Sequence, residues 1–327
     1  MRGRTGISAS NPNTCPPSGS AAAVGRARDD VSHAFLWSPT KGMVDLGTFN
    51  GVNPTPVAIN NAGQVIATSW TSENSRRGYF WSAIDGTIDL AGTSGPLALP
   101  NAINNLGQVV GTAWTGSNST YAFLWTKAEG LVKIGGLGSY QIASATAINN
   151  KGHVVGTSAD SSSFFHAFSW TREDGMIDLG QINANFSPAI NDLGQVLLQS
   201  NIWTRSGGYF DFGSLGGGST VAAAMNNLGQ VVGASTTNNQ SGQTHAFVWT
   251  STGGIVDLNT ANLPAGTTLD NAFAISDNGL ILASSSDGNG SIYLLVPYSS
   301  GITSSQSESF LQRSPFKRPA PGMFVFP

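Results

Sequence analysis

Residues 102–135 read AINNLGQVVGTAWTGSNSTYAFLWTKAEGLVKIG, and this stretch contains the four segments that predict the fold. AIN and GQVVG are short apolar runs on either side of a tight turn, YAFLW is an aromatic run, and GLVKIG ends the unit. Short β-branched and aromatic runs bounded by Gly and Asn are typical of strands, and the apolar residues are not spaced at a helical period. The Asn and Gly residues between AIN and GQVVG suit the backbone conformations of a tight turn. The stretch therefore predicts four consecutive short strands.

The same unit recurs along the chain. In six copies the aromatic strand ends in tryptophan, at positions 37, 81, 125, 170, 203 and 249, with spacings of 44, 44, 45, 33 and 46 residues. A seventh copy, IYLLV (292–296), lacks the tryptophan. Four short strands in about 44 residues is the size of a propeller blade. We therefore predict an all-β fold, a β-propeller of four-stranded blades, with seven blades preferred and six as the alternative.

Packing explains why such a unit has to repeat. One four-stranded sheet cannot bury both of its faces, whereas sheets stacked around an axis bury Val, Ile, Phe and Trp between neighbours. The repeated tryptophans are therefore expected to pack between blades. We place the propeller domain at 21–299, and we expect disordered segments at 1–20 and 300–327, which are rich in Ser, Pro or Arg. The chain is expected to enter one strand into a blade and to leave before its last blade is complete.

The composition excludes several classes of partner. Only 10% of the residues are charged, against about 25% in an average soluble protein, and the formal net charge is -3. Lys and Arg are scattered, so we expect no nucleic-acid partner, and no run of 18 apolar residues predicts a membrane span. Cys15 is the only cysteine, which leaves no intrachain disulfide and no cysteine-based zinc site. A surface built from Ser, Thr, Asn, Gln and Gly favours an extracellular, secreted protein whose export signal has been removed.

The recurring HAFLW, DLG and AIN..GQVVG elements resemble the HAF-repeat family, which is usually described as a family of extracellular bacterial proteins. The similarity covers about 21–296, and it is specific because three elements recur in order at one period. The resemblance implies an extracellular β-repeat protein. It implies no established activity, so it carries over no catalytic residues. The copy at 201–203 departs most from the pattern, and the seventh copy lacks both the tryptophan and a clear DLG strand.

Histidine and aspartate are the residue types that could supply catalysis or metal binding. His33, His166 and His245 share one slot of the repeat, and aspartates share the DLG slot in five copies, where Lys133 replaces the sixth. A residue that repeats around a ring more often serves the blade than a single active site, so both slots favour a structural role. His153 stands where four other copies have Gln, and drift of the repeat is the preferred explanation, so the catalytic residues stay unknown. If the protein is an enzyme, His153 is the first residue to test, although its turn would place it on the face opposite the variable loops. No G-x-S-x-G motif is present, and we expect neither a cofactor nor a metal site.

The repeat predicts a functional face. The turns inside AIN-GQVVG and between HAFLW and DLG are short, whereas the other two connections of each unit are long and variable, and both emerge on the same face. Function often lies in such loops on a rigid scaffold. Exposed aromatic and basic side chains there suit stacking on sugars or gripping a peptide. The candidate ligand-binding residues are Trp70, Arg76, Arg77, Trp114, Tyr140 and Phe186. The alternative is that Trp70 and Trp114 only cap their blades.

Two functions are compatible with these patterns. The first is a secreted binding module that uses the variable loops to hold a polysaccharide, a peptide or a cell-surface ligand, and that works as a monomer. The second is a secreted hydrolase or lyase that acts on a polymer or ester at the mouth of the propeller channel. The fold hosts both kinds of function, so it does not choose between them.

Overall fold

The computed structural model describes residues 23–28, 32–92, 95–116, 119–138, 142–159, 162, 164–238, 242–261, 263–286, 291–297 and 310–316. The chain divides into two compact units, Met1–Leu198 and Gln199–Pro327. Nearly all regular structure in the described residues is β-strand. None of the helices found there is long and apolar enough to cross a membrane.

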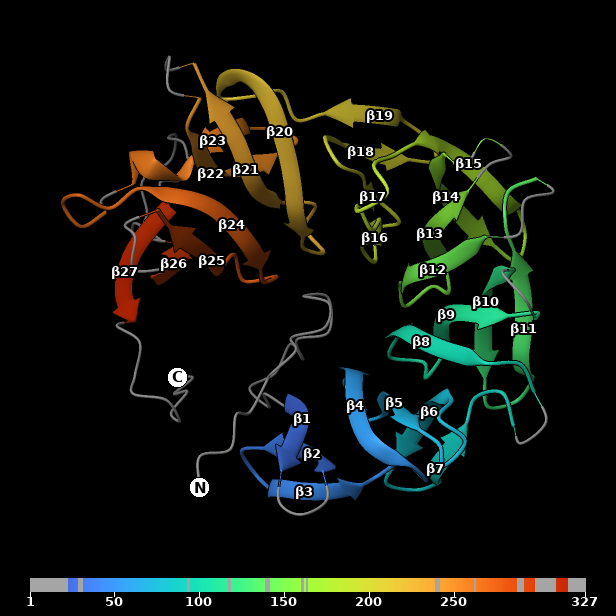
Figure 1. Cartoon of the computed structure of the whole chain (residues 1–327). Helices are drawn as coiled ribbons and strands as arrows, with labels where there is room; N and C mark the ends of the chain where they lie inside the picture. Colours follow the sequence, from blue (N-terminus) through green and yellow to red (C-terminus); the bar gives the residue numbers. More distant parts are fainter. Residues whose placement is uncertain are drawn as a thin grey trace. The chain divides into compact units, whose positions relative to one another are not determined.

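The first unit contains the strands β1 to β17, coloured from blue to yellow-green in Figure 1. They are β1 (Ala23–Arg28), β2 (Ser32–Ser38), β3 (Gly42–Gly47), β4 (Val52–Ile59), β5 (Val65–Trp70), β6 (Arg76–Ser82), β7 (Gly86–Asp89), β8 (Ala98–Ile103), β9 (Val109–Trp114), β10 (Thr120–Thr126), β11 (Gly130–Gly135), β12 (Ala143–Ile148), β13 (Val154–Ala159), β14 (Phe165–Thr171), β15 (Gly175–Gln181), β16 (Ala189–Ile190) and β17 (Val196–Leu197). Each sheet is built from consecutive strands: β1-β2-β3, then β4-β5-β6-β7, β8-β9-β10-β11 and β12-β13-β14-β15, and β16 pairs with β17.

The second unit follows the same rule. Its strands are β18 (Asn201–Thr204), β19 (Gly208–Asp211), β20 (Gly216–Met225), β21 (Val231–Thr237), β22 (Thr244–Thr250), β23 (Gly254–Asp257), β24 (Leu269–Ile275), β25 (Ile281–Ser285), β26 (Ile292–Pro297) and β27 (Phe310–Phe316), and the 3₁₀ turn η2 spans Leu258–Thr260. Strands β20 to β23 form one four-stranded sheet and β24 to β27 another, and β18 pairs with β19.

The described residues form seven antiparallel sheets, of which six have four strands and one has three. The predicted all-β propeller with seven blades is therefore confirmed, and AIN, GQVVG, HAFLW and DLG become its four successive strands. The three-stranded sheet is the first, because the chain enters it without an AIN strand, as expected.

The end of the chain differs from the expectation. We predicted that the last blade is incomplete and that 300–327 is a disordered tail, yet β27 lies in this stretch and pairs with β26 along its length. The reason is that β26 offers a free strand edge in the position where a DLG strand pairs in the other sheets. The predicted tail at 1–20 and the rest of 300–327 lie outside the described residues.

The core lies between neighbouring sheets. One cluster joins Phe80 and Ile66 of the β4–β7 sheet to Phe123 and Trp125 of the next sheet. Trp125 is 3% exposed and stacks on Phe80, with ring centroids 5.2 Å apart. In the second unit, buried residues from β20–β23 and β24–β27 form a similar cluster. These contacts confirm for Trp125 the predicted packing of the repeated tryptophan between blades.

Within each unit, an asparagine that follows an AIN strand holds one sheet to the next. The Oδ1 atom of Asn104 accepts hydrogen bonds from the backbone N–H groups of Leu106 and Gln108, at 3.1 and 3.0 Å. Its Nδ2 atom donates to Oε1 of Gln108 at 2.7 Å and to the backbone carbonyl of Asn149, in the next sheet, at 2.9 Å. Asn104 itself is 3% exposed. One buried side chain therefore shapes the turn and sets the position of the neighbouring sheet.

The same bond recurs along both units, and we call the series the asparagine ladder. It comprises Asn60 to Asn104, Asn104 to Asn149, Asn149 to Asn191 and, in the second unit, Asn226 to Ser276. A parallel row joins the following residues, in which the backbone N–H donates to a side-chain oxygen one sheet on. Its bonds run from Asn61 to Asn105, Asn105 to Asn150, Asn150 to Asp192 and Asn227 to Asp277.

Asn104→Ala is expected to lower the free energy of unfolding by about 3 kcal/mol, because it leaves several buried backbone groups without partners. Urea denaturation of both proteins measures the difference. Leu106→Ala in the same turn is the control, since Leu106 is 68% exposed and should change stability by less than about 0.5 kcal/mol. Equal stability of Asn104→Ala and the wild type would show that the ladder does not hold the sheets.

Candidate functional site

In each sheet the two ends of the strands differ in character. The turns between the first and second strands and between the third and fourth strands lie at one end of the strands, which we call the turn edge. The connections from β5 to β6 and from β7 to β8, and their counterparts in the other sheets, lie at the opposite edge, which we call the variable edge. This confirms that both variable connections emerge on one side of each blade. Trp70, Arg76, Arg77 and Trp114 all lie at the variable edge, at the ends of their strands.

The β4–β7 sheet presents a row of three side chains at its variable edge. Val52 of β4 pairs with Trp70 of β5, and Trp70 pairs with Arg76 of β6. Directly opposed residues in an antiparallel sheet point to the same face, so the three side chains lie beside one another. Val52 is 52% exposed and Trp70 is 40% exposed. We call these three residues the Trp70 row.

The guanidinium of Arg76 is oriented by its own sheet. Its Nε and Nη2 atoms donate to Oγ1 of Thr68, at 3.0 and 2.8 Å. Thr68 lies two residues before Trp70 on the same face, and it is buried. Both donors reach one oxygen, so the guanidinium is held against β5, the strand that ends in Trp70. The row therefore combines an aromatic surface, an aliphatic one and a cation in a defined geometry.

Backbone strain gathers around this row. The non-glycine residues with positive φ in the described part of the chain are Phe49, Asn50, Asn53 and Asn74. Phe49, at φ 54°, is nonetheless 2% exposed and packs against Tyr79, with ring centroids 6.2 Å apart. Such conformations cost about 1–3 kcal/mol each and concentrate at functional sites. Asn50, Asn53 and Asn74 are exposed, so they carry amide groups to the surface around the Trp70 row.

The loop before β4 is tied to the end of β5. Oγ of Ser69 donates to the carbonyls of Thr48 and Val52, at 2.9 and 3.0 Å. Gly51 passes so close that a Cβ atom there would collide with the carbonyl of Trp70. The loop that carries Asn50 and the start of β4, which carries Asn53, are therefore anchored to the strand that carries Trp70. Nothing in the repeat marks Val52 or these asparagines, and for that reason the sequence alone does not point to them.

The other predicted residues are placed differently. Arg77 pairs with Asp89 through Nε at 2.9 Å and donates to the carbonyl of Gly92, so its charge is compensated within the sheet. Trp114 is partly buried at the end of β9, and its backbone N–H donates to Leu97. Phe186 is partly buried in the loop after β15. Tyr140 lies outside the described residues. The structure thus brings Trp70 and Arg76 together on paired strands, whereas Arg77 is held by Asp89 and both Trp114 and Phe186 are partly buried.

The repeated histidine and aspartate slots are partners. Nδ1 of the histidine and the carboxylate of the aspartate lie 2.7 Å apart for His33 and Asp45, and 2.7 Å for His245 and Asp257. The His166 and Asp178 pair measures 3.0 Å, and in the second copy Arg77 replaces the histidine. The backbone N–H of Gly47 and the His33 ring together hold the pKa of Asp45 below its ordinary value.

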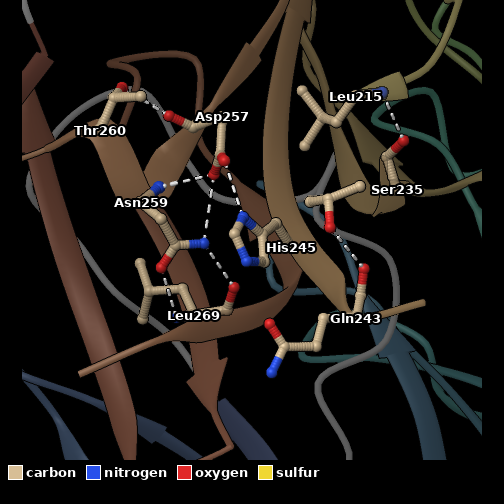
Figure 2. Close-up of polar contacts among 9 residues, drawn as sticks. Leu215, Ser235, Gln243, His245, Asp257, Asn259, Thr260 and Leu269 are labelled. Atoms are coloured by element: carbon tan, nitrogen blue, oxygen red, sulfur yellow. Dashed lines mark hydrogen bonds and ion pairs between the residues drawn. The ribbon is translucent and has the colours of Figure 1, made fainter. Parts of the chain in front are cut away.

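The pair at β22 and β23 shows what these contacts do (Figure 2). Oδ2 of Asp257 accepts from His245, and Oδ1 accepts from the backbone N–H of Asn259 at 2.8 Å. Asn259 in turn exchanges two bonds with the backbone of Leu269, at 2.8 and 2.7 Å. Leu269 begins β24 of the next sheet. The pair therefore links β22 to β23, and through Asn259 it positions the following sheet. This is the structural role expected from its repetition.

His153 also has a structural partner. Its Nε2 atom lies 2.6 Å from Oγ of Ser169. Ser169 is 2% exposed and stands where other copies have an aliphatic or aromatic residue, so both departures from the repeat meet in one buried hydrogen bond. A nucleophilic hydroxyl has to reach a substrate, and Ser169 does not. Among the described residues, no three His, Cys, Asp or Glu side chains are grouped as a metal site would need.

This chain is similar to several solved structures. It matches a puromycin-hydrolyzing peptidase from Mycobacterium tuberculosis with a TM-score of 0.51 and 10% identity, covering 90% of this chain and 51% of the peptidase. The β-propeller domain of the Trilobed protease from Pyrococcus furiosus matches with a TM-score of 0.44, 9% identity, and 87% and 81% coverage. TolB from Acinetobacter baumannii matches with a TM-score of 0.41, 11% identity, and 84% and 63% coverage.

The chain thus spans about half the length of the peptidase. No family model matches the chain, and no curated protein matches its sequence. At 10% identity the likeness to the peptidase extends to the fold alone.

Asp257→Ala is expected to lower the free energy of unfolding by about 1–2 kcal/mol, because the carboxylate caps η2 and holds His245. His245→Arg should cost less than about 0.5 kcal/mol, since Arg77 already occupies this slot beside Asp89. Chemical denaturation measures both. Glu173→Ala, which removes an exposed carboxylate, is the control. A larger loss from His245→Arg than from Asp257→Ala would contradict the structural role.

The lowered pKa of Asp45 predicts an acid dependence. A carboxylate whose pKa is lower in the folded state stabilises the fold above its ordinary pKa of 3.8, and this stabilisation disappears as the pH falls through the folded-state value. Titration of the side-chain carbon signal by NMR should give a pKa below 3.8. In His33→Ala the pKa should rise but stay below 3.8, because the Gly47 N–H is the larger cause. An unshifted pKa in the wild type would contradict this geometry.

Proposed function

We propose that this chain is a secreted β-propeller binding module that holds a polysaccharide at its variable edge, around the Trp70 row. The observation that carries the proposal is the exposed indole of Trp70, flanked by Val52 and by the oriented guanidinium of Arg76. An exposed aromatic face supplies stacking area against the flat faces of sugar rings. The exposed amides of Asn50, Asn53 and Asn74 supply donors and acceptors for hydroxyl groups.

The polysaccharide is favoured over a peptide by the chemistry around the row. A peptide that binds by strand addition needs an open sheet edge, whereas the Trp70 row lies at the ends of three strands that are paired with each other. Asparagine amides beside a tryptophan can bind neutral hydroxyl groups at several points, and Arg76 can add a contact to an acidic sugar. We also propose that the protein belongs to the HAF-repeat family, is extracellular and works as a monomer, on the grounds of its repeat and its low content of charge.

A hydrolase or lyase receives no support from a specific arrangement in the described residues. The His–Asp pairs recur in several sheets, where each links two neighbouring strands, and the serine beside His153 is buried. A catalytic site would need residues other than these repeated pairs. We therefore put the binding function forward as the single proposal.

Trp70→Ala is expected to weaken binding to a polysaccharide at least about ten-fold, because a central stacking residue contributes much of the affinity. Stability should fall by less than about 1 kcal/mol, since the indole is at a strand end. Binding is measured by calorimetry on a panel of neutral and acidic polysaccharides, with thermal unfolding of each variant.

Trp37→Ala is the matched control, because Trp37 is 37% exposed but lies at the turn edge of its sheet. The result that contradicts the proposal is an unchanged affinity of Trp70→Ala for a polysaccharide that the wild type binds. Binding to none of the panel would contradict it as well. Release of product in proportion to the amount of protein would replace the binding module by the hydrolase or lyase.

A further inference from the structure

A second candidate site lies on the flank of the first unit, between strand β7 and the pair β10–β11. A cavity of about 590 Å³ opens there, which lies within the range of pockets that hold small ligands, about 300–1,000 Å³. Ile88, Asp89 and Leu90 line it from β7 and the residue that follows, and Tyr121, Trp125 and Leu131 line it from the next sheet. It is separate from the Trp70 row, since none of the three residues of that row lines it.

The lining is largely aromatic and aliphatic. Trp125 and Tyr121 are 3% and 7% exposed, so their rings are held by the surrounding packing and present only part of their surface to the cavity. Trp125 is fixed from behind by Phe80 of the adjoining sheet. Side chains held in this way form a preformed apolar surface, which lowers the entropic cost of binding a ligand. The cavity is therefore suited to the apolar body of a small molecule.

One exposed lysine at this cavity, Lys133, has no ion-pair partner among the residues that the structure describes. Lys127 pairs with Asp85, and Asp89 pairs with Arg77. Lys133 has no carboxylate within ion-pair distance among the residues that the structure describes, and its Nζ atom lies 5.0 Å above the centre of the Tyr121 ring. Burial raises the pKa of the Tyr121 phenol, so this ring stays neutral and does not serve as a counter-ion. The lining thus carries one net positive charge next to an apolar surface.

The repeat itself singles out this position. Lys133 stands in the slot that holds aspartate in five other copies, and Tyr121 stands in the slot that holds histidine or arginine in the copies with a pair. In those copies the two slots form a hydrogen-bonded ion pair within one sheet. In this copy both residues differ, and both line the cavity. Drift could have kept the pair. Here both partners have changed, and Lys133 is left without a carboxylate partner beside the cavity.

We propose that this cavity binds a small organic monoanion with an apolar body, such as a fatty or aromatic carboxylate. The ammonium of Lys133 pairs with the acid group, and the apolar body lies against Trp125, Leu131 and Ile88. A charge-assisted hydrogen bond of this kind supplies orientation, while burial of the apolar body supplies most of the affinity. The proposal does not depend on the ligand of the Trp70 row.

The test uses the full chain and the fluorescent monoanion anilinonaphthalene sulfonate, which has an aromatic body. The wild type should bind it at one saturable site. Lys133→Asp, which restores the residue found in the other copies, should weaken binding at least about ten-fold, and Lys133→Met should weaken it in the same direction. Lys151→Met removes an exposed lysine in a turn away from the cavity and should bind like the wild type. Circular dichroism checks that each variant is folded.

Competition then separates the acid group from the apolar body. Octanoate should displace the dye from the wild type, whereas octanol, which has the same chain without the charge, should displace it at least about ten-fold less well. The proposal is overturned if the dye shows no saturable binding, if Lys133→Asp and Lys133→Met bind like the wild type, or if octanol competes as well as octanoate. A folded Lys133→Met that binds less dye would support the proposal even if Lys133→Asp failed to fold.

Discussion

The hydrogen bond from the side chain of an AIN asparagine to the next sheet of the same unit is the constraint on which the rest of this structure depends. Apolar packing between sheets is strong but has no direction, so by itself it does not select one register of one sheet against another. The amide of Asn104 does select it, because its oxygen is used by its own turn and its nitrogen reaches the carbonyl of Asn149. A buried amide with both ends engaged tolerates little displacement, since an unpaired polar group in the interior is costly. Each repeat thereby determines the position of the next one.

This constraint acts at the turn edge, and it explains why the variable edge can differ from one sheet to another. Once the ladder holds the sheets, the connections at the opposite edge need only link the strands. In several copies a pair of side chains twelve residues apart closes that edge, as with His33 and Asp45. The β4–β7 sheet has such a pair in Arg77 and Asp89, and in addition its backbone is left-handed at Asn50, before β4, and at Asn53, in β4, where Ser69 holds the chain. Strands that are held by the asparagine ladder at the turn edge and carry variable connections at the other edge form a suitable scaffold for a binding surface.

The strands of the repeat could be predicted because each one carries its own local signal, an apolar run with turn residues on both sides. The partnership of His245 and Asp257 could also have been predicted, since both residues recur in fixed slots of two neighbouring antiparallel strands, on which Asp257 lies opposite Phe247, two residues after His245. Strand β27 could not, because FLQRSPF carries no element of the repeat, and only the open edge of β26 gives it a partner. At the candidate site, Trp70 and Arg76 stand out from the repeat by their residue types. Val52 and the anchored asparagines depend on a register and on backbone angles that no local pattern encodes.

Departures from a repeat are informative only when both members of a contact are considered. His153 replaces a glutamine and Ser169 replaces an apolar residue, and the two meet at 2.6 Å. Each change satisfies the other, so this pair needs no ligand to explain it. Tyr121 and Lys133 also change together, yet their contact leaves the lysine charge without a carboxylate and next to an apolar cavity. Lys133 is exposed, and a cation–π contact at an exposed site is worth only about 0.5–1 kcal/mol, which is less than a charged hydrogen bond supplies, about 1.5–3 kcal/mol. His153 and Ser169 therefore satisfy each other within the protein. Lys133 has no carboxylate partner, and a bound anion would supply one.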